Sequence, residues 1–279
     1  MKTFEAKWKG GDGTDFFVRG WEPGDKPKAL VALVHGLGEH TGRYEHVAKM
    51  MTDAGYAFAG FDLRGHGKSG GTRGHFPSLD VAMQDIREFF IFLTQQYPDI
   101  PHFLYGHSLG GLLVLTYALK NKAGLRGVIA TGPGLRSPIH EQKMKVIMAK
   151  LLGSLAPTTL LASELETAAL SHDPNVINTY QADPLIHDRI SLGFGKAGLL
   201  ATDYVWSHAG EFSIPLLIMH GAADRITYSH GSEDFFKLAA KNNRDVTLKI
   251  WDGLYHEIHN EPQKEDVIKL MIEWLNKHL

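Results

Sequence analysis

The sequence contains no cysteine, no apolar run of membrane-spanning length and no long basic stretch. Without cysteine there is no disulfide, no thiolate metal site and no cysteine nucleophile. The 29 basic and 31 acidic residues give a formal charge of −2, so we expect no nucleic-acid partner. The charged start MKTFEAKWKGGDG lacks the apolar segment of a signal peptide, which favours a soluble cytoplasmic protein.

What the chain does contain is a regular alternation of strand and helix patterns. Two β-type runs, 4–8 and 15–21, flank the turn sequence GGDGT and predict a hairpin. Apolar runs then predict strands at 29–36, 56–62, 102–106, 125–131, 214–221 and 246–253, with helices at 43–54, 79–97, 109–121, 232–242 and 263–278. This order predicts an α/β fold with a mainly parallel central sheet flanked by helices.

One connection is far too long for a simple crossover. About eighty residues separate the strand that ends at 131 from the strand that begins at 214, whereas a crossover needs only about a dozen. We therefore predict a core made of residues 1–133 and 212–279, with an inserted helical lid at 134–211. Within the lid, apolar residues recur at helical spacing: Met144, Ile147, Met148, Leu151, Leu152 and Leu155. This stripe either packs on the main domain or forms an exposed face that admits acyl chains or contacts lipid.

Two segments match the G-x-S-x-G pattern of a nucleophilic serine, GKSGG at 67–71 and GHSLG at 106–110. An activated serine needs a sharp strand-to-helix turn, which only the second segment has. Ser108 is thus the predicted nucleophile, and Ser69 a loop residue beside the site. The loop around Ser69 nearly spells a phosphate-binding loop, but Asp62 replaces its first glycine and no helix follows, so we expect no nucleotide.

A serine nucleophile needs a histidine base and a carboxylate that orients the histidine. In this type of fold both follow the serine in chain order, each just beyond a late strand. Asp224 follows the strand at 214–221 and His256 follows the strand at 246–253, which makes them the predicted acid and base. Asp252 and His259 are the rival residues for these roles.

Backbone amides are predicted to bind the oxyanion that forms when the serine attacks a carbonyl. The amide of Leu109 follows the nucleophile at the start of a helix, and the glycine-rich loop after the strand at 29–36 offers the amide of Leu37. The cluster HEIHN lacks the second histidine of a metal-binding HExxH motif. We therefore expect neither a metal nor a cofactor.

Several blocks together resemble the monoacylglycerol lipases and related lysophospholipases of the α/β-hydrolase superfamily, the serine aminopeptidase-like hydrolase group. They are HGLGEHTGRY at 35–44, FDLRGHGKSGG at 61–71, GHSLGG at 106–111, YQADPL at 180–185, GAAD at 221–224 and GLYHEIHNEP at 253–262. The resemblance implies an α/β-hydrolase fold with Ser108, Asp224 and His256 as the triad and the amides of Leu37 and Leu109 as the oxyanion hole.

The resemblance further implies that four residues lie near a glycerol head group: Glu39, Arg43, His107 and Tyr180. An ion pair between Glu39 and Arg43 that braces the oxyanion loop is an equal alternative. The expected function is a serine carboxylic-ester hydrolase that releases fatty acid and glycerol from monoacylglycerols, with transient lipid contact through the lid. Alternatives are a lysophospholipase, a short- or medium-chain carboxylesterase, a peptidase of the same fold and a non-catalytic ligand receptor.

Overall fold

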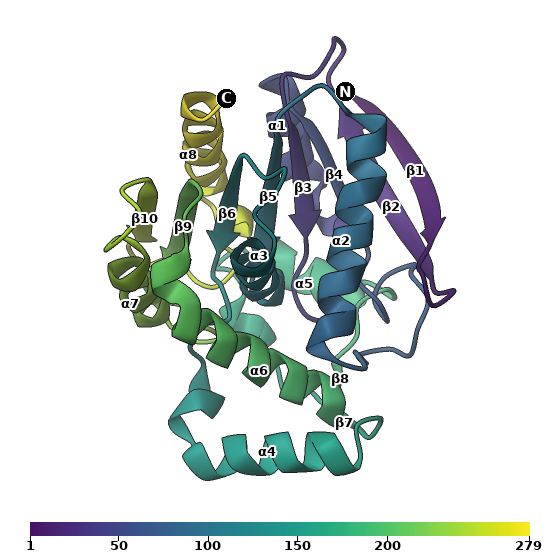
Figure 1. Cartoon of the computed structure of the whole chain (residues 1–279), viewed down its shortest axis with the longest axis vertical. Helices are drawn as coiled ribbons and strands as arrows, with labels where there is room; N and C mark the ends of the chain where they lie inside the picture. Colours follow the sequence, from purple (N-terminus) through teal and green to yellow (C-terminus); the bar gives the residue numbers. More distant parts are fainter.

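A computed structural model describes all 279 residues, and its centre is an eight-stranded sheet (Figure 1). The strand order is β1-β2-β4-β3-β5-β6-β9-β10. The strands are β1 (Lys2–Lys9), β2 (Asp15–Glu22), β3 (Leu30–Val34), β4 (Ala57–Phe61), β5 (His102–His107), β6 (Gly127–Thr131), β9 (Leu216–Gly221) and β10 (Val246–Trp251). Only the N-terminal hairpin β1-β2 is antiparallel to its neighbours, so the mainly parallel sheet is confirmed.

Helices cover both faces of the sheet and create two apolar cores. One core of 37 residues lies under α2 (Leu79–Gln96), α3 (Leu109–Lys120), α6 (Leu192–His208) and α7 (Ser229–Ala239). The other, of 22 residues, lies under α1 (Glu45–Asp53) and α8 (Lys264–Lys277). The strands β3, β4, β5, β6 and β9 are buried at every residue, which is why they appear in the sequence as continuous apolar runs.

The long connection between β6 and β9 carries the inserted elements (Figure 1). In chain order these are η2 (Pro138–Glu141), α4 (Lys143–Leu155), β7 (Leu160–Ala162), η3 (Thr167–Ala169), α5 (Pro174–Ala182), β8 (Arg189–Ser191) and α6, followed by η4 (Ala209–Glu211). β7 and β8 form a small antiparallel sheet that the sequence patterns do not predict. Phe194, Ala201 and Val205 of α6 pack into the larger apolar core, so α6 belongs to the core by its packing. The division of the chain into a core and a lid at residues 134–211 stays a prediction.

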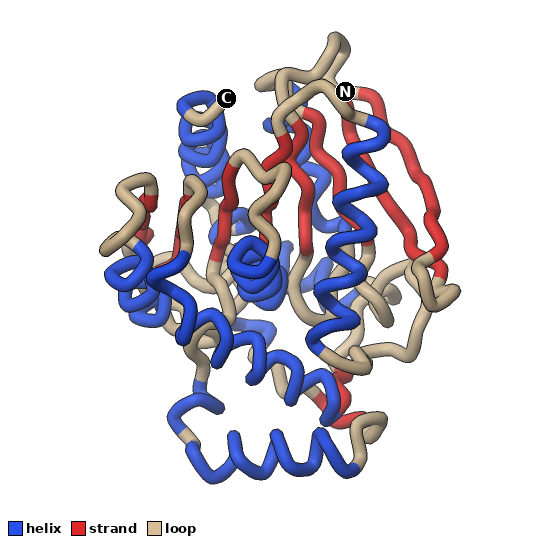
Figure 2. Tube along the Cα trace, viewed as in Figure 1, coloured by secondary structure: helices blue, strands red, loops and turns tan.

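The apolar stripe of α4 is exposed, so the interpretation that it packs on the main domain is wrong. Met144 and Leu155 are 70% and 73% exposed, and Gly153 is the only buried residue of the helix. The stripe is exposed because α4 packs on α6 through its opposite face. At Gly153 the two helices are so close that a Cβ would overlap the Leu192 carbonyl. Figure 2 shows α4 as the outermost helix beyond α6. None of the helices combines the length and the apolar character that a membrane-spanning helix needs.

The helix predicted at 43–54 begins later than expected. Residues Thr41–Tyr44 form a 3-10 turn, η1, and α1 starts at Glu45. The His40 side chain caps this turn by accepting a hydrogen bond from the Gly42 amide. The loop after β3 is therefore fixed by the turn that follows it.

Candidate active site

Ser108 lies on a strained turn between β5 and α3. Its φ of 56° and ψ of −118° lie outside the conformations that a residue with a side chain normally adopts. Its neighbours have no room for a Cβ: one on Gly106 would overlap the Gly110 carbonyl, and one on Gly110 would overlap that of Val34. This tight crossing places the serine hydroxyl beyond the carboxyl end of the sheet, as the motif predicts.

The structure brings Ser108, His256 and Asp224 together in one hydrogen-bonded row. The Nε2 atom of His256 is 2.8 Å from the Ser108 Oγ, and its Nδ1 atom is 2.7 Å from an oxygen of Asp224. Asp224 follows β9 and His256 follows β10, so each side chain comes from the carboxyl end of a strand. With Nδ1–H donating to Asp224, the Nε2 lone pair of His256 faces the serine hydroxyl.

Asp224 is held in place by more groups than sequence reasoning identifies. Its Oδ1 atom accepts from the amides of Ile226 and Thr227, and its Oδ2 atom accepts from the Thr227 hydroxyl and from His220 Nε2 at 3.0 Å. His220 stands four residues before Asp224, and its other nitrogen is 2.7 Å from the Ser232 hydroxyl. In the sequence, only the position of His220 near the end of an apolar strand could have indicated this role.

The pKa values of the acid and the base shift in opposite directions. Burial alone would raise the pKa of Asp224, but the charge of His256 and the hydrogen bonds from His220 and His256 hold it well below its usual range. Burial alone would lower the pKa of His256, but the Asp224 carboxylate outweighs it and raises this pKa above its ordinary value. The pair therefore favours an ionised aspartate beside an imidazole that gains a proton easily.

The two predicted oxyanion donors, Leu37 and Leu109, both line the cavity at Ser108. Leu109 is the first residue of α3, so its N–H has no partner within the helix. The Leu37 amide makes no backbone hydrogen bond, and Gly36 lies so close to the serine that a Cβ on it would be 3.4 Å from the Ser108 Cβ. The inserted segment supports this loop, because the His187 amide donates to the Gly38 carbonyl at 3.0 Å.

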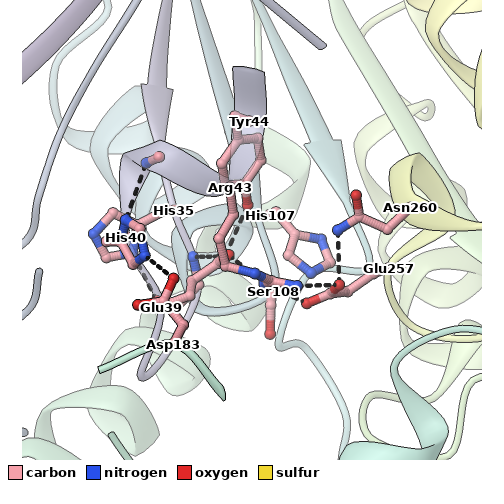
Figure 3. Close-up of polar contacts among 12 residues, drawn as sticks. His35, Glu39, His40, Arg43, Tyr44, His107, Ser108, Asp183, Glu257 and Asn260 are labelled. Carbon is pink, nitrogen blue, oxygen red and sulfur yellow. Dashed lines mark hydrogen bonds and ion pairs between the residues drawn. The ribbon is translucent and has the colours of Figure 1, made fainter. Parts of the chain in front are cut away.

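Glu39 and Arg43 form the ion pair that was the alternative to head-group binding (Figure 3). One oxygen of Glu39 accepts from the Gly36 amide at 2.6 Å and from the Tyr44 hydroxyl at 2.8 Å. Its other oxygen accepts from Arg43 at 2.6 Å, and Arg43 also donates to both oxygens of Glu257 at 2.7 Å each. The sequence patterns do not predict a role for Glu257. Only its position directly after His256 could have indicated one.

His107 and Tyr180, the other two predicted head-group residues, also line the cavity at Ser108. The His107 ring lies 4.7 Å from that of His256, and its Nδ1 is 3.1 Å from the Thr131 carbonyl. Burial, together with neighbouring histidines, lowers the pKa of His107 well below its usual value, so the ring is neutral. The Tyr180 ring, from α5, lies 4.8 Å from the Arg43 guanidinium.

The cavity at Ser108 has a volume of about 330 Å³, within the range of pockets for small organic ligands. Polar groups gather where Ser108, His256 and the Glu39 loop meet. Away from them the walls come from α3, α6 and the inserted segment and are mainly apolar, with Leu112, Phe194 and Leu199 beside a few polar residues such as Ser163 and Thr202. The site therefore fits a ligand with one polar and one apolar end.

The rival residues have other surroundings. The Ser69 hydroxyl donates to the Asp62 carbonyl at 2.5 Å and accepts from the Phe17 amide, so it braces its loop. His259 stacks on Tyr44 at 5.0 Å, and burial lowers its pKa to about 3. Asp252 is exposed in the turn after β10.

The parallel sheet, the strained turn at Ser108 and the covered cavity define a hydrolase of the α/β type. The chain belongs to the serine aminopeptidase S33 family, whose sequence profile matches residues 25–263. It is 40% identical over 94% of its length to an abhydrolase domain-containing protein of Dictyostelium discoideum, but spans only 28% of that longer protein. It is 34% identical to the monoacylglycerol lipase of Mycolicibacterium smegmatis, over 93% of this chain and 92% of that one.

A solved structure gives the same result for the fold. The crystal structure of the Paleococcus ferrophilus monoacylglycerol lipase matches with a TM-score of 0.84 and 35% identity, covering 100% of both chains. These matches confirm the family resemblance and the α/β-hydrolase fold predicted from the motifs. They identify the chain as a serine hydrolase.

Proposed function

We propose that this protein hydrolyses monoacylglycerols to fatty acid and glycerol through an acyl-enzyme formed on Ser108. The observation that carries the proposal is the row Ser108–His256–Asp224, which opens into a cavity with a polar and an apolar end. Two similar proteins, those of Mycolicibacterium smegmatis and Paleococcus ferrophilus, are named monoacylglycerol lipases, which supports the same substrate class here.

The reaction proceeds in two halves that use the same groups. His256 Nε2 takes the proton of the Ser108 hydroxyl as Oγ attacks the ester carbonyl, and Asp224 stabilises the imidazolium. The amides of Leu37 and Leu109 donate to the oxyanion, each worth about 3 kcal/mol of barrier. His256 then protonates the departing glycerol oxygen, and water repeats the sequence on the acyl-enzyme.

The head group is recognised where the polar residues converge. Glu39 and Arg43 already bind several protein groups, so their main role is to hold the oxyanion loop in its conformation. Only their remaining hydrogen-bonding capacity is free for the head group. Tyr180 comes from the inserted segment, and its hydroxyl lies beside Gly38 of the oxyanion loop. We assign a direct contact with a glycerol hydroxyl to Tyr180, and to the unused nitrogen of His107.

The partner surface is the exposed face of α4. Six large apolar side chains lie open on it, and the exposed Lys143 and Lys145 flank them. This combination is typical of a helix that lies in a lipid interface. We propose that α4 contacts the lipid surface from which the substrate comes; the cytoplasmic location stays a prediction.

The test compares kcat/KM on a medium-chain monoacylglycerol and on a short nitrophenyl ester, with Ser108→Ala as the blank. Preference for the glycerol ester and loss of both activities in Ser108→Ala is the expected result. Activity on the short ester alone would make the protein a general esterase, and activity in Ser108→Ala would refute the nucleophile. Tyr180→Phe should raise KM for the glycerol ester about 2- to 10-fold and leave the nitrophenyl ester unchanged.

A further inference from the structure

The mechanism leaves one charged group beside the base without a role. Glu257 directly follows His256, and its side chain is 3% exposed. Its two oxygens accept two parallel hydrogen bonds from Arg43, both 2.7 Å long, and Oε2 also accepts from the side-chain Nδ2 of Asn260 at 2.7 Å. A forked pair of this kind fixes direction as well as distance. Glu257 therefore holds Arg43 rigidly against the segment that carries the base.

The connection continues without a break to the oxyanion loop (Figure 3). Arg43 also donates to Glu39 at 2.6 Å, and Glu39 accepts from the Gly36 amide at 2.6 Å. Gly36 is followed by Leu37, the predicted oxyanion donor. Three side chains thus link the residue after the base to the residue before an oxyanion donor, although these segments are more than two hundred positions apart in the sequence.

The same three side chains carry a net negative charge. Burial alone would raise the pKa of Glu257, but Arg43 lowers it to about 2, so this carboxylate is ionised at neutral pH. The Arg43 guanidinium lies between two carboxylates and stays charged. After the larger effect of Asp224, the charges of Glu257 and Glu39 both raise the pKa of His256 and so favour the imidazolium.

We infer that Glu257 is a positioning residue, which acts through Arg43 and Glu39 to fix the oxyanion loop relative to His256 and to stabilise the imidazolium. This inference rests on the proposed function, because it assigns Glu257 a part in that same hydrolysis. Glu257 lines the cavity, but its carboxylate oxygens are bound by Arg43 and the Asn260 side chain, and the proposed mechanism gives it no bond to the nucleophile or the substrate. Its effect is therefore on kcat and on the pH profile, and much less on KM.

The principal variant is Glu257→Gln, assayed on the medium-chain monoacylglycerol across a pH range. The amide removes the charge and places a donor against one Arg43 nitrogen, so one of the paired bonds is lost. We expect kcat to fall about 10- to 100-fold, as for a small misplacement at a reacting centre, with KM changed less than about threefold. We expect the acid limb of kcat/KM to move to lower pH, because the loss of negative charge makes His256 harder to protonate.

Two further variants separate charge, reach and stability. Glu257→Asp keeps the charge but is too short to hold both Arg43 nitrogens, so it should lower kcat while leaving the acid limb in place. Asp85→Asn is the matched control, because Asp85 is a buried carboxylate bound by Arg64 at 2.7 and 2.9 Å that does not line the cavity at Ser108. It should lower the melting temperature and leave kcat and the pH profile unchanged.

The outcomes separate the inference from the proposed function. An unchanged kcat and an unmoved acid limb in Glu257→Gln would overturn the inference, and so would an equal loss of kcat in Asp85→Asn. If circular dichroism shows that Glu257→Gln does not fold, Glu257→Asp decides: wild-type kcat would overturn the inference. The proposed function itself would be refuted only by a wild type that does not hydrolyse the monoacylglycerol, whether or not it cleaves the short ester, or by activity of Ser108→Ala.

Discussion

The glycines of α6 lead to a prediction about acyl-chain length. Gly195 and Gly198 both line the cavity, and a Cβ on either would meet no atom within 4 Å. Glycine inside a helix costs about 0.5–1 kcal/mol relative to alanine, and packing gives no reason for it at these two positions. Gly193 differs, since a Cβ there would be 2.9 Å from the Pro157 carbonyl oxygen. We therefore attribute Gly195 and Gly198 to the space that the acyl chain needs.

Two substitutions at Gly198 separate helix stability from cavity space. Gly198→Ala should raise the free energy of unfolding by about 0.5–1 kcal/mol, which is roughly 2 °C in melting temperature for a chain of this size. Gly198→Leu fills the cavity with four carbons. If these exclude about three methylenes of a long chain, at ~0.8 kcal/mol each, kcat/KM for that chain falls roughly 60-fold.

The assay is kcat/KM over monoacylglycerols from butyryl to palmitoyl, together with thermal unfolding of each variant. Gly198→Leu should lose activity on the long chains and keep it on butyrylglycerol. Gly193→Ala is the control and should destabilise the fold by about 1–3 kcal/mol through overpacking, without changing the chain-length profile. A Gly198→Leu profile that is the same as the wild-type profile would refute the assignment of this space to the acyl chain.

Three further results are expected. Asp224→Asn should lower kcat about 10³- to 10⁴-fold on a nitrophenyl ester while the protein stays folded, because asparagine favours the wrong tautomer of His256; a loss under tenfold would contradict this. In the wild type, kcat/KM should fall as the pH drops through the raised pKa of His256, because the base must start unprotonated. An acid limb of the pH profile centred below the ordinary pKa of histidine would contradict the pairing with Asp224. Gly110→Ala should destabilise the protein by about 3 kcal/mol in urea unfolding, because its Cβ would overlap the Val34 carbonyl, and a neutral effect would show that the turn can relax.

The three residues of the proposed triad could be predicted because the fold itself brings them together. Each follows a strand of the parallel sheet, and the carboxyl ends of such strands meet at one edge. Chain order and strand position were therefore enough to select Asp224 and His256, although the sequence holds 16 histidines. The distances of 2.8 and 2.7 Å agree with that selection.

The groups that support these residues could not be predicted in the same way. Arg43 and Glu257 are 214 positions apart, and neither lies in a pattern that names the other. His220 belongs to a buried strand, where a histidine without a known partner has no predicted role. Such contacts depend on where side-chain atoms lie to within a few ångströms. Sequence patterns specify only the helix or strand in which a residue lies and the face of that element on which it stands.

The lid shows the same limit for apolar residues. The spacing of residues 144–155 correctly indicates a helix with one apolar face, but periodicity says nothing about what covers that face. In the structure α4 turns its small residues, Gly153 and Ala149, toward α6 and the cavity, and leaves its large ones open. Six exposed large side chains on one helix are costly in water and useful only against another apolar surface. For an enzyme whose proposed substrate resides in lipid, we propose that this surface is the lipid itself, which would place α4 between the lipid and the cavity that ends at Ser108.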